Sequence, residues 1–315
     1  MVRYFPVILL VCILSAGSAS AFTLAGFYWG YSPVPYEITS VGSDNVSDGS
    51  DLNAVRAAFA TWQEILFNRL SFQEVGLVSW LPQVMDGYST VGWIEITDED
   101  WRTNWAFTLA PRILAITACV YDPETLVTWE CDIFVNGVHA SWSTTGTPGT
   151  EDLGLVLNHE VGHFVGLGHS EDPGALMHVP ATVTTPQVDD IVGARLIYFG
   201  ADVFDFVSRL YQLVLGREPD EQGFWHNMAL SLVLGEVETV TSAFFLSPEF
   251  LGGAGADPTA FVTALYRATL NRDPDPAGLA HNLNLITTEG WPLQWLVDGF
   301  LASFEFQEKD PFRSW

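Results

Sequence analysis

The sequence of 315 residues predicts an α+β unit followed by an all-α unit. Short runs rich in β-branched and aromatic residues lie between residues 72 and 136, and segments with helical spacing precede and follow them. This order is typical of a sheet with helices packed on it. The C-terminal third instead contains an internal repeat with helical spacing in each copy, which indicates stacked helical units.

The first 21 residues have the three parts of a secretory signal peptide. Arg3 supplies a basic start, residues 7–14 form an apolar core, and Ala19 to Ala21 is a small-residue cleavage site. The apolar run is too short for a membrane-spanning helix, although a retained anchor is the alternative interpretation. We therefore predict a secreted, extracellular protein without a membrane span.

The segment that follows is predicted to contain a strand, a loop and a helix. The strand lies within residues 26–40, and apolar residues at helical spacing over residues 52–66 predict a helix with one face on the core. Asp51 is interpreted as the N-cap of this helix. Alternatively, Asp44, Asp48 and Asp51 could bind Ca²⁺, although this loop lacks the acidic residue that closes an EF-hand loop.

Three runs are predicted to be strands of one sheet, namely Val91–Ile96, Leu114–Val120 and Cys131–Val135. Two of them are expected to be neighbours joined by a turn, and each contains a cysteine. Once the signal peptide is removed, Cys119 and Cys131 are the only cysteines left. An even number in an exported chain favours a disulfide over two buried thiols, although the sequence alone does not settle the pairing.

The segment from His159 to His169 is the most informative part of the chain. His159 and His163 are four residues apart, so a helix would project both from one face toward one metal ion. Gly166 can adopt the left-handed conformation that ends a helix, and the turn would bring His169 to the same ion. Three imidazoles with one open position are typical of catalytic Zn²⁺. Glu160 lies beside the first ligand as a candidate general base.

These residues, with the Ala-Leu-Met run that ends at Met177, resemble the matrixin branch of the metzincin metallopeptidases. The resemblance extends from about Phe27 to Phe199 and is nearest to short secreted bacterial enzymes. It implies a twisted mixed β-sheet with an active-site helix, and a hydrophobic floor under the metal formed by Met177. It also implies that protein or peptide substrates pair with an edge strand containing Ile133, Phe134 and Val135.

The sequence departs from this family at two places. His178 stands where a tyrosine often follows the methionine, and His139 is alone where those enzymes have a cluster for a second zinc ion.

Residues 189–198 are predicted to form the last helix, which closes the peptidase unit of residues 22–200 near Gly200.

Residues 201–315 are predicted to form a helical unit of two copies, about 202–251 and 258–307, with a period of about 55 residues. Each copy resembles a helical repeat of unknown function found in bacterial exoproteins. An Arg-x-Pro-Asp segment recurs in both, and we interpret it as a salt-bridged turn. His226 and His281 recur as well, and we expect them to cap or pack within each copy because isolated histidines do not make a zinc site.

The formal net charge of −26 comes from 38 acidic and only 12 basic residues. Such a surface repels nucleic acid and anionic lipid, so neither is an expected partner.

Three classes of function agree with the sequence. The first is a secreted zinc endopeptidase whose C-terminal repeats attach it to a cell surface or matrix. The second is a catalytically silent surface or binding protein that uses the same scaffold, and Glu160 argues against it because silent relatives usually lose the base. The third is a zinc hydrolase that acts on something other than peptides.

Overall fold

The computed structural model of the protein describes residues 21–95 and 112–313. The predicted signal peptide lies outside the described residues except for Ala21, and so does Ile96. The chain divides into two compact units, Met1–Tyr198 and Phe199–Trp315, and the division falls inside one helix, α3 (Val188–Arg209).

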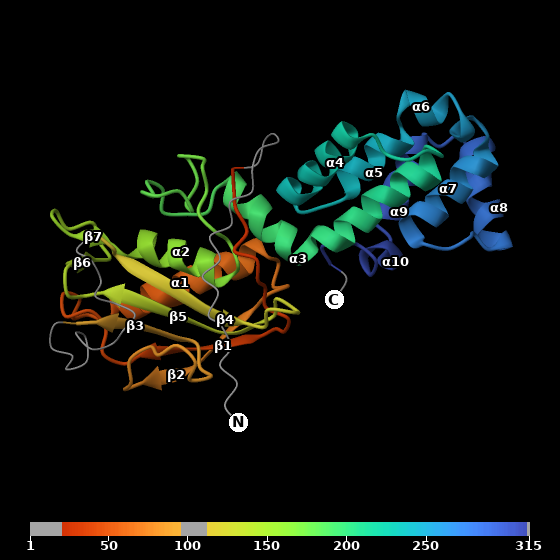
Figure 1. The fold of residues 1–315 in the computed structure, drawn as a ribbon. Helices are drawn as coiled ribbons and strands as arrows, with labels where there is room; N and C mark the ends of the chain where they lie inside the picture. The colour runs from red at the N-terminus through yellow and green to blue at the C-terminus, as the bar shows by residue number, and fades with distance from the viewer. Residues whose placement is uncertain (1–20, 96–111, 314–315) are drawn as a thin grey trace. The chain divides into compact units, whose positions relative to one another are not determined.

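A five-stranded sheet forms the centre of the N-terminal unit (Figure 1). Its strands lie in the order β2-β1-β3-β5-β4, and all neighbours are parallel except β4, which runs antiparallel to β5. The bounds are β1 Val34–Thr39, β2 Phe72–Val78, β3 Thr90–Ile94, β4 Ala115–Tyr121 and β5 Thr128–Asn136. The predicted α+β class is thus confirmed for this unit.

Two helices, α1 (Ser50–Ile65) and α2 (Leu153–Phe164), cover one face of this sheet. The ring of Phe59 on α1 stacks on Tyr36 of β1 with centroids 4.0 Å apart. The indole N–H of Trp62 on α1 donates to the carbonyl of Asn158 on α2 over 2.9 Å. Buried aromatic side chains of α1 therefore fix this helix against both α2 and the sheet.

Asp51 is not the N-cap of α1, contrary to the sequence interpretation. The cap is Gly49, whose positive φ of 75° suits glycine, and it makes no side-chain hydrogen bond. Asp51 lies in the first turn, buried, and its carboxylate accepts the N–H of Ser43 over 2.8 Å. This carboxylate ties the preceding loop to the helix, where acidic groups also interact favourably with the helix dipole.

The predicted edge strand is wrong. β5, which contains Ile133, Phe134 and Val135, lies inside the sheet, because Ile133 pairs with Val91 of β3 on one side and Thr117 of β4 on the other. Its backbone hydrogen-bonding groups are therefore used within the sheet. The strand at this end of the sheet is β4.

The predicted disulfide is confirmed. Cys119 and Cys131 face each other across the antiparallel β4–β5 pair, with Cα atoms 4.0 Å apart, and they form a disulfide. The bond fastens the outermost strand to its neighbour.

Helices make up the C-terminal unit, as predicted (Figure 1). They are the end of α3, the π-helix η1 (Leu210–Val214), α4 Glu221–Leu234, α5 Glu238–Phe245, α6 Pro248–Leu251, the 3₁₀ turn η2 (Ala254–Ala256), α7 Pro258–Leu270, α8 Pro276–Thr287, α9 Leu293–Leu301 and α10 Phe304–Gln307. The predicted helix end near Gly200 is wrong, because α3 continues to Arg209. Buried Phe199, Val203 and Phe206 extend its apolar face past the glycine.

The two copies of the repeat share the same internal contacts. Tyr211 accepts a hydrogen bond from Asn227 over 3.2 Å, and Tyr266 accepts the same bond from Asn282 over 3.2 Å. The arginine of each Arg-x-Pro-Asp segment binds a glutamate at the end of its own copy over 2.6 Å, in the pairs Arg217–Glu249 and Arg272–Glu305. These contacts support the salt-bridged turn.

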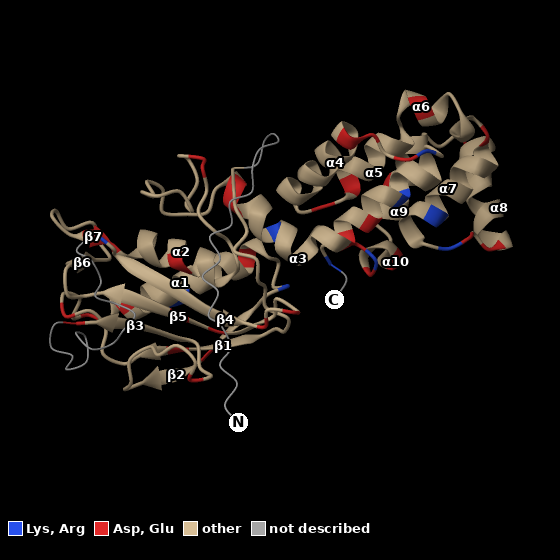
Figure 2. Ribbon diagram, viewed as in Figure 1, with Lys and Arg blue, Asp and Glu red and all other residues tan. Residues whose placement is uncertain are grey.

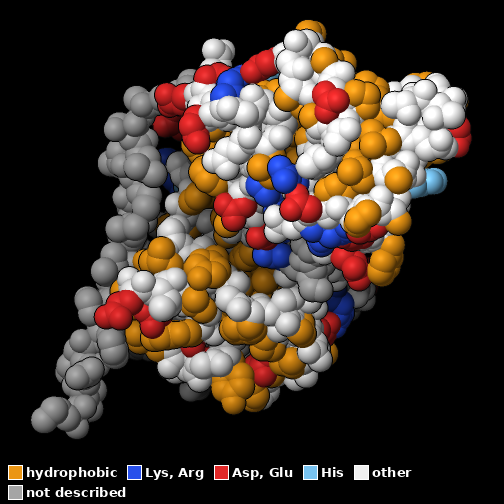
Figure 3. All heavy atoms as spheres, turned by 90° about the vertical axis from the view of Figure 1, so that its right-hand side faces the viewer, with side chains coloured by type: hydrophobic (Ala, Val, Ile, Leu, Met, Phe, Trp, Pro, Cys, Tyr) orange, Lys and Arg blue, Asp and Glu red, His pale blue; other side chains and the backbone are white. Residues whose placement is uncertain are grey.

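His226 and His281 are exposed, so they neither cap nor pack as expected. Acidic side chains are spread over both units while basic ones are few (Figure 2). On the face drawn in Figure 3, the basic side chains lie next to carboxylates.

Candidate metal centre and active site

Local sequence explains where α2 begins and ends. The Asp152 carboxylate caps it by accepting the N–H of Leu155 over 3.0 Å. Beyond the last turn, Gly166 adopts a φ of +106°, and a side chain there would also meet the carbonyl oxygen of Phe27 at 2.6 Å. Only glycine suits this position, and the resulting turn directs the chain toward His169.

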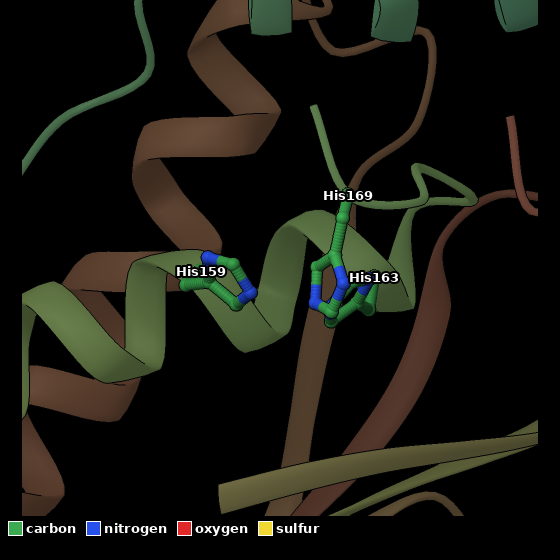
Figure 4. A group of neighbouring side chains, drawn as sticks. All are labelled: His159, His163 and His169. Carbon is green, nitrogen blue, oxygen red and sulfur yellow. The ribbon is translucent and has the colours of Figure 1, made fainter. Parts of the chain in front are cut away.

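The three histidines of the motif converge (Figure 4). His159 and His163 lie on successive turns of α2, and His169 comes from the segment after it. One ligand nitrogen from each lies within 4.8 Å of the others. Within residues 21–95 and 112–313, no other three histidine, cysteine or acidic side chains come together in this way.

Hydrogen bonds to carbonyl oxygens orient two of the rings. Nδ1 of His159 lies 2.8 Å from the carbonyl oxygen of Leu176, and Nδ1 of His163 lies 2.8 Å from that of Leu167. A proton on each Nδ1 leaves the Nε2 lone pair free for a metal. Burial lowers the pKa of both imidazoles to about 4, so they are neutral at pH 7 and fit the donor set of zinc.

Met177 packs under α2. It is buried, and a side chain on Gly162 of α2 would collide with its sulfur and would lie 2.9 Å from the ring of Trp62. The Asp190 carboxylate holds the turn by accepting the N–H groups of Leu176 over 2.8 Å and Met177 over 3.0 Å. No local pattern in the sequence indicates this role for Asp190.

Glu160 is buried between α2 and the sheet. Its carboxylate accepts the hydroxyl of Thr117, on β4, over 2.6 Å. Burial raises the pKa of Glu160 above the usual range, while the hydrogen bond from Thr117 opposes this shift. Thr117 was not identified from the sequence, since a threonine in a strand is ordinary and its partner lies 43 residues away.

Neither the two other histidines near the motif nor the candidate calcium ligands join this centre. His178 directs Nδ1 to the carbonyl of Ser170 over 3.0 Å, and the described residues place no cluster around His139. Asp44, Asp48 and Asp51 do not meet as a group of three ligands, and the Asp51 carboxylate is taken up by Ser43. Calcium binding stays a prediction.

No helix among the described residues combines the length and the apolar character needed to cross a membrane. Comparison with known proteins gives two family matches: "Matrixin" over residues 28–199, and "Domain of unknown function (DUF4214)" over residues 241–309.

Two curated proteins match shorter stretches. Neutrophil collagenase of Homo sapiens is 45% identical over 60 residues, which cover 17% of this chain and 13% of that protein. Metalloendoproteinase 1 of Glycine max is 43% identical over 65 residues, covering 19% of this chain and 21% of that protein. The matches thus span about a fifth or less of these relatives, whereas the Matrixin match spans more than half of this chain. The chain therefore belongs to the matrixin family.

Proposed function

We propose that this protein is a secreted zinc-dependent endopeptidase. The observation that carries the proposal is the convergence of three imidazoles beside a buried carboxylate. His159, His163 and His169 would hold the metal. Zinc, when bound, supplies the Lewis acidity that polarises a peptide carbonyl and makes water easier to deprotonate.

Glu160 is the proposed general base and acid. Its carboxylate takes a proton from the attacking water and later delivers it to the nitrogen of the leaving amine. A raised pKa suits this exchange, because a base with a pKa nearer neutrality also returns the proton readily. The Thr117 hydroxyl fixes the direction of the carboxylate before substrate arrives.

The substrate is proposed to pair with β4 rather than with β5. β4 is hydrogen-bonded to β5 on one side only within the described residues, and Thr117 on this strand touches Glu160. An extended peptide added along β4 would therefore run beside the catalytic groups. Backbone pairing accepts many sequences, so selectivity would come from the side-chain pockets.

Secretion is proposed from the basic start, apolar core and small-residue cleavage site of residues 1–21. The disulfide between Cys119 and Cys131 suits an oxidising compartment. We further propose that residues 22–200 act as the peptidase domain, and that the C-terminal unit attaches the enzyme near its substrates and so raises their effective concentration.

Incubation with a mixed peptide library tests the proposal. The secreted protein is expected to cut internal peptide bonds, to lose this activity with a zinc chelator, and to regain it when zinc is restored. Cleavage that resists the chelator would contradict the metal assignment. A protein that binds zinc but cuts no peptide or protein would instead support the silent scaffold, which is the alternative function.

A further inference from the structure

The C-terminal unit contains a hollow with a distinctive wall. It has a volume of about 750 Å³ and lies between the end of α3, the start of α4 and the end of α7, with Phe204, Arg209 and Trp225 in its wall. Sites for small molecules typically have volumes of roughly 300–1,000 Å³. The hollow is therefore large enough for an organic ligand of two or three rings.

Aromatic side chains line one part of this hollow. Phe204 is 46% exposed and Trp225 is 54% exposed, so both rings are accessible to a ligand. Both pack edge-to-face on the buried ring of Phe224, with centroids 4.9 and 5.6 Å away. The packing limits their motion, so the hollow presents flat apolar faces that are already ordered.

A guanidinium group with an unused donor lines the same hollow. The Nε atom of Arg209 is buried and has no hydrogen-bond partner, although the charge of Asp205 is close enough to influence it. The guanidinium lies over the ring of Phe206 at 5.2 Å, which holds it in place. Nε itself is closed to solvent, so Arg209 would bind a ligand oxygen through the part of this half-buried side chain that lines the hollow.

The second copy of the repeat shows that its fold does not need this wall. Both copies keep the tyrosine–asparagine hydrogen bond and the arginine–glutamate ion pair. At the period of about 55 residues, the second copy has small side chains where the first has the wall: Thr259 for Phe204, Ala264 for Arg209 and Ala280 for Trp225. Large side chains that the architecture does not require, gathered around one hollow, indicate binding.

We propose that this hollow binds a neutral oligosaccharide through pyranose rings stacked on Trp225 and Phe204. In β-1,4-linked glucose or N-acetylglucosamine the ring substituents are equatorial, so each ring face carries only C–H groups that pack well on an aromatic ring. Arg209 would donate to ring hydroxyl or ether oxygens.

The charge of the wall disfavours an anionic ligand, and its hydrogen-bonding groups suit hydroxyls. The wall also contains the acidic residues Asp205, Glu218 and Glu221, whose carboxylates accept hydrogen bonds from hydroxyl groups and repel an anion. The net charge of −26 adds to this repulsion for any polyanion. Hydroxyl groups can accept from Arg209 and donate to these carboxylates, so a neutral polyhydroxyl ligand uses both kinds of group in the wall.

Titration of the full secreted chain with cellotetraose and chitotetraose, followed by calorimetry and tryptophan fluorescence, tests the proposal. We expect at least one of the two to bind with a Kd of about 1 mM or lower. Trp225→Ala and Arg209→Ala each introduce the residue of the second copy, and each should weaken binding about tenfold or more. Trp295→Ala removes another exposed tryptophan of the same unit, outside the hollow, and should leave binding unchanged.

Several results would overturn the proposal. One is the absence of binding by both tetrasaccharides, and another is equal binding by the Trp225→Ala and wild-type chains. Preferential binding of tetralysine or tetragalacturonate would show that the hollow recognises a charged ligand instead. Dimerisation of the wild-type chain that Trp225→Ala abolishes would show that a second copy covers the aromatic wall. Peptide hydrolysis is a separate readout, so failure here leaves the proposed enzyme activity intact.

Discussion

Asp190 is predicted to hold the methionine turn in place, and Asp190→Ala measures its contribution. The buried carboxylate accepts the N–H groups of Leu176 and Met177 at 2.8 and 3.0 Å, and also that of Gln187 at 2.7 Å. Hydrogen bonds to a charged group contribute roughly 1.5–3 kcal/mol each, and such contributions do not add fully. Burial raises the pKa of Asp190, so desolvation offsets part of this gain. We expect a net loss of about 3 kcal/mol in the free energy of unfolding.

Calorimetry of the full chain checks this value. For a unit of this size, a loss of about 3 kcal/mol corresponds to a fall in Tm of roughly 6–12 °C. Asp190→Asn keeps one acceptor oxygen and should lie between the wild type and Asp190→Ala. Glu171→Gln removes an exposed carboxylate from the same loop and should leave Tm unchanged. A Tm for Asp190→Ala within 1 °C of the wild type would refute the reasoning.

Three further predictions concern the sheet. Thr117→Val should lower kcat about tenfold and shift the acidic limb of the pH–rate profile to higher pH, because the hydroxyl stabilises the Glu160 carboxylate. Thr117→Ser should restore both kcat and the profile, and an unchanged profile in the valine variant would contradict this role. Replacing Cys119 and Cys131 with serine should cost about 2–3 kcal/mol for a loop of this length, and denaturant titration that finds no loss would exclude a stabilising bridge. Burial raises the pKa of Asp132 to about 8, so between about pH 4 and 8 the folded state holds a proton that the unfolded state has lost, and the free energy of unfolding falls as pH rises through this range. Asp132→Asn should flatten this dependence, and a stability–pH profile identical to that of the wild type would contradict the prediction.

The cluster of three histidines was predictable because all of them come from one short segment. Helix geometry places His159 and His163 on one face, and a glycine turn returns the chain to His169, so local spacing is sufficient. The residues that position this cluster and its turn from elsewhere in the chain were not predictable in this way. Thr117 reaches Glu160 from 43 residues away, and Asp190 reaches the methionine turn from 13 and 14 residues away. Such contacts depend on tertiary packing that no local pattern encodes.

The fold shows the same difference between local and long-range features. Runs of β-forming residues predicted the strands β3, β4 and β5, and the even number of cysteines favoured the disulfide that joins β4 to β5. The order of strands across a sheet is set by long-range pairing, so the sequence did not show that β4 rather than β5 is outermost. The end of α3 was misplaced because Gly200 looked like a helix stop, whereas the apolar face on both sides of it carries the helix through.

The Glu160→Gln variant provides the most direct test of the central claim. It keeps the size of the side chain and an acceptor for Thr117, but it cannot take a proton. Zinc content and peptide cleavage should be measured on the same purified sample, beside the wild type. We predict that zinc is retained at the wild-type level while kcat/KM falls by about 10²-fold to 10⁴-fold. Unchanged cleavage with zinc retained would contradict the assignment of Glu160 as the general base.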